Sequence, residues 1–158
     1  MAIELLSSRL RFFAIASVVF VGGNFLVALS LYVAGAPEPE TVRVPSSLLA
    51  AIAFLAVLTP LVETVLLTAS IGITSRVFKG RMAIACLGAA PLIALHYPMG
   101  LTKVACVAAG FAWSGWCYMR LRAQGASFSF RYWFLFGLHA VNNAIAVVAH
   151  FAFAAPSG

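Results

Sequence analysis

The stretch VPSSLLAAIAFLAVLTPLVETVLLTASIGITS, residues 44–75, decides the fold class of this chain. It holds one charged side chain, Glu63, in a run of apolar and small residues. The run is longer than the ~20 residues that a helix needs to cross a bilayer. A charge at the bilayer centre costs about 2.5–3.5 kcal/mol on insertion scales. We therefore expect Glu63 to face a protein interior and to serve a function.

The whole chain is as apolar as this stretch. Of its 158 residues, 63% are hydrophobic and 9% are charged, whereas soluble domains carry about 25% charged residues. The sequence predicts an all-α fold, a polytopic transmembrane helix bundle of about five spans, as one integral membrane domain over residues 1–158. The predicted spans are 12–34, 47–75, 82–98, 102–119 and 132–154.

The net charge of +6 comes mostly from Lys and Arg at the ends of the apolar segments. Basic residues at these places set membrane orientation, so we expect a lipid bilayer and no nucleic acid as partner. Basic clusters precede the first span, occupy RVFKGR (residues 76–81) and bracket the last connection, whereas APEPETVR (36–43) holds two acids. The positive-inside rule then predicts a multi-pass cell-membrane protein with a cytoplasmic N-terminus.

Two features of the sequence favour plain structural interpretations. The apolar stretch 12–33 exceeds the 7–15 residues of a signal-peptide core, which favours a retained anchor. Cys86, Cys106 and Cys117 lie in apolar runs without CxxC spacing, so we expect them to pack as small hydrophobes rather than form a disulfide or zinc site.

Four strongly polar side chains in the predicted spans can meet. Glu63 and His96 belong to the second and third spans. His139 and Asn143 share one face of the fifth span because they are four residues apart. At ~1.5 Å per residue, all four fall inside the membrane. A carboxylate, two imidazoles and an amide suit acid–base chemistry on a water molecule, or the binding of a metal ion.

The remaining polar and small residues of the spans predict helix packing. Asn24, Asn142 and His150 are expected to make interhelical contacts. Small residues in the fourth span predict a face for close helix approach: Ala105, Ala108, Ala109, Ala112 and Gly115.

The polar motifs resemble those of the CPBP intramembrane proteases, which include the CAAX prenyl proteases and many bacterial immunity-type proteins. PLVETVLLT (60–68) is similar to the family's Glu-Glu-x-x-x-Arg motif. LIALH (92–96) is similar to Phe-x-x-x-His, and HAVNN (139–143) to His-x-x-x-Asn. The resemblance covers residues 45–150, which would form a protease-like core. It departs from the family at three positions, which here are Thr64, Thr68 and Leu92 in place of Glu, Arg and Phe.

The resemblance implies an intramembrane endopeptidase that uses no metal or other cofactor and cleaves a membrane-associated protein or peptide. Glu63 would be the general base on a water molecule that His96 positions, while His139 and Asn143 would stabilise the oxyanion. Other functions fit the same residues. They are a metal-dependent membrane hydrolase, a non-catalytic membrane immunity or binding protein, and a proton or ion pathway.

Overall fold

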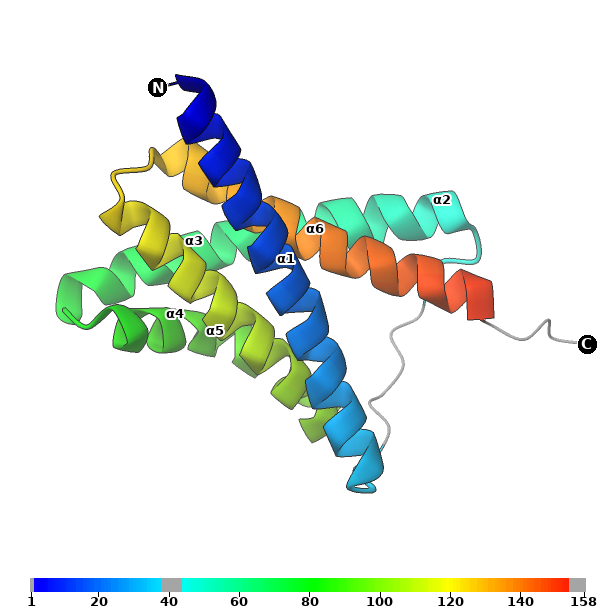
Figure 1. Cartoon of the computed structure of the whole chain (residues 1–158). Helices are drawn as coiled ribbons and strands as arrows, with labels where there is room; N and C mark the ends of the chain where they lie inside the picture. The colour runs from blue at the N-terminus through cyan, green and yellow to red at the C-terminus, as the bar shows by residue number, and fades with distance from the viewer. Residues whose placement is uncertain (1, 38–43, 154–158) are drawn as a thin grey trace, which may run out of the picture.

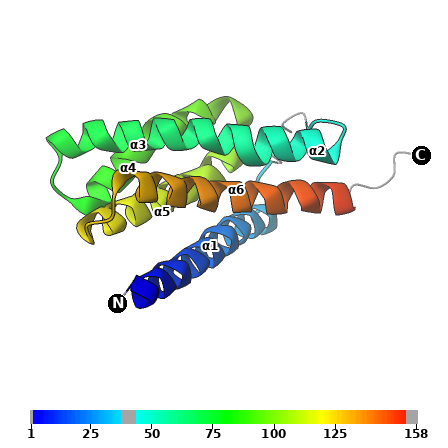
Figure 2. The same cartoon turned by 90° about the horizontal axis from the view of Figure 1, so that it is seen from above.

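Helices build the part of the chain that the computed structural model describes, residues 2–37 and 44–153. In chain order they are α1 (Ala2–Val33), α2 (Leu48–Ala51), the π-helix η1 (Ile52–Leu58), α3 (Thr59–Val77), α4 (Arg81–Leu95), the 3-10 turn η2 (Tyr97–Met99), α5 (Leu101–Ala123) and α6 (Phe128–Phe153). Because α2, η1 and α3 follow one another without a break, they form one long rod (Figure 2). The all-α prediction is confirmed.

Three helical segments of the described chain are long and apolar enough to cross a membrane: Ser7–Val33, Leu48–Val77 and Phe128–Phe153. The third span is shorter than predicted, because α4 has 15 residues. At 1.5 Å per residue this helix is about 22 Å long, whereas the bilayer core is about 30 Å thick. Large apolar side chains such as Val18, Phe25 and Leu49 are each more than 60% exposed, as contact with lipid would require.

The helices pack around α5 and α6. Helices α3 and α6 run antiparallel side by side, α4 packs between α3 and α5, and α1 crosses α5 and α6 (Figures 1 and 2). The start of α1, the α3–α4 connection and the α5–α6 connection lie at one end of the molecule (Figure 1).

Basic side chains at this end lie over aromatic rings. The Arg9 guanidinium is 4.6 Å from the Phe130 ring centre, and that of Arg131 is 4.6 Å from the Tyr118 ring centre. These cation–π contacts join α1 to α6 and α6 to α5. Residues that the sequence assigns to one side of the membrane thus gather at one end, while residues 38–43 of the acidic segment lie outside the described residues.

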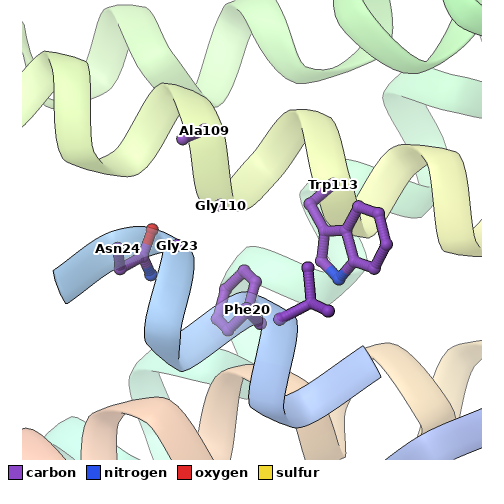
Figure 3. A pocket seen from close by; sticks show the side chains of 7 residues that line it. Phe20, Gly23, Asn24, Ala109, Gly110 and Trp113 are labelled. Atoms are coloured by element: carbon purple, nitrogen blue, oxygen red, sulfur yellow. The ribbon is translucent and has the colours of Figure 1, made fainter. Parts of the chain in front are cut away.

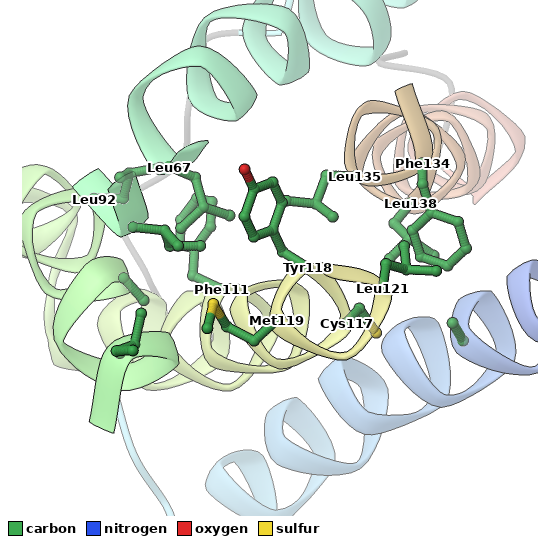
Figure 4. Packing of buried hydrophobic residues seen from close by; sticks show 14 of the residues in the cluster. Leu67, Leu92, Phe111, Cys117, Tyr118, Met119, Leu121, Phe134, Leu135 and Leu138 are labelled. Carbon is green, nitrogen blue, oxygen red and sulfur yellow. The ribbon is translucent and has the colours of Figure 1, made fainter. Parts of the chain in front are cut away.

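The core consists mainly of apolar side chains from α3, α4, α5 and α6, with Ala16 from α1 (Figure 4). Its members include Leu67, Leu92, Phe111, Cys117 and Leu138. Cys117 therefore packs as predicted, whereas Cys86 is exposed.

Glycines allow the helices around this core to approach closely. A β carbon at Gly115 would lie 2.9 Å from the carbonyl oxygen of Ala85, and one at Gly88 would lie 2.7 Å from Ile71 Cγ1. Gly115 of the predicted small-residue face thus lets α5 contact the backbone of α4.

Candidate active site

Three helices bring Glu63, His96 and His139 together. Glu63 Oε1 lies 3.6 Å from His96 Nε2, and Oε2 lies 3.7 Å from His139 Nδ1. The side chains of Glu63 and His96 are 19% and 15% exposed, whereas that of His139 is 4% exposed. One carboxylate therefore faces two imidazoles. The His139 side of the site is buried, whereas the His96 side is partly exposed.

The backbone fixes the proton on His96. This residue lies between the end of α4 and the start of the turn η2, and Gly100 closes the turn with a φ of 90° that favours glycine. His96 Nδ1 lies 2.8 Å from the carbonyl oxygen of Leu92. A carbonyl oxygen only accepts, so Nδ1 must carry the proton. A neutral His96 then presents an unprotonated Nε2 to Glu63.

Two residues that the sequence analysis missed hold His139. Ser114 Oγ lies 2.9 Å from His139 Nε2, and the ring of Phe20 stacks on the imidazole at 5.4 Å with 10° between the planes. Ser114 directly precedes Gly115 of the predicted small-residue face, and Phe20 belongs to α1, outside the predicted core of 45–150. Neither position carries a local sequence signal for such a contact.

Asn143 bonds to the backbone of the α2–α3 rod. Its Nδ2 donates to the carbonyl oxygen of Leu55 at 2.9 Å. In the π-helix η1 an N–H bonds the carbonyl five residues earlier, as Thr59 does with Phe54. Pro60 has no N–H, so the Leu55 carbonyl lacks its helical donor, and Asn143 supplies one. The amide predicted to stabilise an oxyanion therefore already has a structural partner.

Asn143→Ala is expected to destabilise the protein, because it leaves the Leu55 carbonyl unpaired. Such a loss costs about 1–3 kcal/mol. Adding Pro60→Ala restores an N–H at residue 60, so the double variant should regain stability, as thermal unfolding in detergent would measure. The variant Pro60→Ala alone is the control. An Asn143→Ala protein with the wild-type melting temperature would show that the bond contributes nothing.

Polar contacts tie α1 to the rest of the bundle. Asn24 Nδ2 donates to Asn142 Oδ1 at 3.2 Å, which confirms the interhelical contact predicted for both residues. Trp113 Nε1 donates to the carbonyl oxygen of Ala16 at 3.2 Å. His150, by contrast, is exposed, and its ring lies edge-on to Phe151 of the same helix.

A cavity of about 190 Å³ lies between α1 and α5 (Figure 3). Its lining is mostly apolar, with polar groups on Asn24 and Trp113. The lining includes Gly110, where a β carbon would lie 3.0 Å from the Phe20 ring. Phe20 lines this cavity and also stacks on His139. The ring of Phe20 thus lies between the cavity and the buried side of the histidine.

Thr64 and Thr68, at the two positions where the resembling family has Glu and Arg, are both buried. Thr64 is fully buried, and Thr68 Oγ1 donates to the carbonyl oxygen of Thr64 at 2.8 Å within the same helix. These positions therefore hold small hydroxyl side chains where the resembling family places a charged pair.

Among residues 2–37 and 44–153, no group of three or more His, Cys, Asp or Glu side chains is arranged to hold a metal ion. Comparisons of the chain with protein-family models, curated proteins and solved structures found no match.

Proposed function

We propose that this chain is an intramembrane endopeptidase that hydrolyses a peptide bond of a membrane-associated protein or peptide. The observation that carries the proposal is the placement of Glu63 between two imidazoles at 3.6 and 3.7 Å, on three apolar helices. An ionisable group placed at membrane depth is costly and is usually retained for function.

The proton on His96 supports a water-activating role. When His96 is neutral, its Nε2 carries no proton, so Nε2 and Glu63 Oε1, which lie 3.6 Å apart, both accept hydrogen bonds. A water molecule that donates one O–H to each would satisfy both and would keep its lone pairs free. Such a water molecule is oriented as a nucleophile, and Glu63 and His96 are the more exposed members of the site.

The reaction then needs one base. Glu63 takes a proton from the water molecule as its oxygen bonds to the carbonyl carbon of the substrate. The same proton passes to the amide nitrogen when the carbon–nitrogen bond breaks, which releases a carboxylic acid and an amine. His139 orients Glu63 through Nδ1, so its role differs from the oxyanion stabilisation that the resemblance implies.

A non-catalytic membrane immunity or binding protein is the second candidate. It is favoured by the use of Asn143 in helix packing and by Thr64 and Thr68 at the positions of the family's charged pair. In this case the Glu63 cluster would only hold three helices together.

Cleavage by the purified full-length protein in proteoliposomes tests the proposal. Labelled peptides with one apolar span serve as substrates, and products are identified by mass spectrometry. Cleavage is expected to persist in EDTA or phenanthroline, because Glu63 and His96 activate water without a metal. Loss of cleavage with a chelator, restored by zinc, would indicate a metal-dependent hydrolase. A wild-type protein that cleaves none of the peptides would favour the binding protein.

A further inference from the structure

Ser114 bonds across the bundle rather than along its own helix. Thr68 and Thr74 donate to carbonyl oxygens one turn earlier in α3, as hydroxyls in helices often do. The Ser114 hydroxyl instead lies 2.9 Å from His139 Nε2, between α5 and α6, and Ser114 is fully buried. A fully buried hydroxyl has no access to a substrate, so it cannot be an attacking group here.

The two ring nitrogens of His139 face different partners. Nε2 faces the Ser114 hydroxyl, which can donate or accept, and Nδ1 faces Glu63 Oε2 at 3.7 Å. An ionised carboxylate only accepts, so Nδ1 assists Glu63 only when it carries a proton. A neutral imidazole has one N–H, and with the proton on Nδ1 the other nitrogen needs a donor.

We infer that Ser114 is a positioning residue that donates to His139 Nε2 and thereby keeps the His139 proton on Nδ1, aimed at Glu63. Phe20 and Phe111 pack on the ring at centroid distances of 5.4 and 5.1 Å, so the imidazole makes its polar contacts only at its edge. The role in orienting Glu63 rests on the proposed function, but the position of the proton does not.

Nitrogen-15 NMR of the full-length protein in lipid nanodiscs tests this inference without any substrate. The chain has three histidines. The signals that disappear in the His96→Gln and His150→Gln variants belong to those residues, so the signals that remain in both are assigned to His139. Protonated and unprotonated ring nitrogens resonate in separate regions of the spectrum. At a pH where the imidazole is neutral, His139 is expected to carry its proton on Nδ1. His96 should do the same, because of the Leu92 carbonyl.

Ser114→Ala is expected to move part of the His139 population to the Nε2–H form and to leave His96 unchanged. Ser114→Thr keeps the hydroxyl and should retain the wild-type spectrum. Ser17→Ala is the matched control, since Ser17 Oγ is buried and has no hydrogen-bond partner among the described residues. A wild-type proton on Nε2, or an unchanged spectrum in a folded Ser114→Ala protein, would overturn the inference. The wild-type measurement decides even if Ser114→Ala fails to fold.

Activity gives a second, separate readout. Loss of the hydrogen-bond partner of a metal-ligating histidine costs about 10-fold to 100-fold in metal affinity or activity. By analogy, we expect cleavage by Ser114→Ala to fall by about 10-fold or more and to recover in Ser114→Thr. A proton on Nδ1 in a protein that cleaves none of the peptides would favour the binding protein and would leave the effect of Ser114 on the His139 proton in place.

Discussion

Glu63→Gln is expected to lower peptide cleavage by about 100-fold or more, because general base catalysis contributes 10²–10⁴-fold. Glutamine keeps the size of the side chain and can still bond His96 and His139, but it cannot take a proton from water. Initial rates of peptide cleavage in proteoliposomes, at equal amounts of folded protein, measure the effect. The melting temperature should change little, since glutamine replaces both hydrogen-bonding positions of the carboxylate.

The same chemical change elsewhere provides the control. Glu40→Gln removes an acid from the connecting segment 36–43 of the sequence and should leave cleavage unchanged. Full activity of Glu63→Gln would eliminate the glutamate mechanism. Loss of folding in Glu63→Gln, with no cleavage by the wild-type protein, would instead fit a cluster that only holds helices together.

Much of the fold follows from apolar length and charge. The predicted spans 47–75 and 132–154 lie within a few residues of Leu48–Val77 and Phe128–Phe153, because Pro, Ser, Arg and Lys border these segments. The predicted bounds of the third and fourth spans agree less well with the helices of the structure. Residues 82–98 are cut short by the turn at Tyr97–Met99, and α5 continues to Ala123 with Arg120 inside it.

The sequence predicts only those residues of the candidate site whose polar side chains are energetically unfavourable in an apolar segment. Glu63, His96 and His139 stand out in this way, and the structure places them together. The orientation of these three side chains depends on neighbouring residues that are ordinary in an apolar helix. A serine between a tryptophan and a glycine gives no local signal, and neither does a phenylalanine in an apolar helix. Ser114 and Phe20 could therefore be found only from the packing of α1, α5 and α6.

Asn143 shows a different limit of prediction from sequence. Its spacing from His139 correctly puts both residues on one helix. The carbonyl that Asn143 bonds, however, lacks a helical donor because of Pro60, which lies 83 residues earlier in the chain. A proline inside an apolar helix indicates that a helical carbonyl has lost its donor. Which donor would serve the freed carbonyl depends on the register between α6 and the α2–α3 rod, which the sequence pattern does not specify.

Gly115→Val is expected to cause the largest loss of stability of the variants considered. The new β carbon would lie 2.9 Å from the backbone oxygen of Ala85 and 3.1 Å from its Cα, so no flexible side chain can move aside. Overpacking costs typically 1–3 kcal/mol and occasionally more. We expect about 3 kcal/mol, which lowers the melting temperature of a chain of this size by roughly 6–12 °C.

The relief of this clash must come from separation of α4 and α5, and His96 directly follows the last residue of α4. Gly115→Val should therefore also displace His96 from Glu63 and reduce cleavage in the protein that remains folded. Gly72→Val is the matched control, because a β carbon there meets nothing within 4 Å and both variants bear the same cost of a β-branched residue in a helix. Equal melting temperatures for the two variants, measured in the same detergent, would show that α5 does not contact the backbone of α4 at Gly115. A large loss in Gly115→Val alone would establish that this contact holds the helix carrying His96 in place.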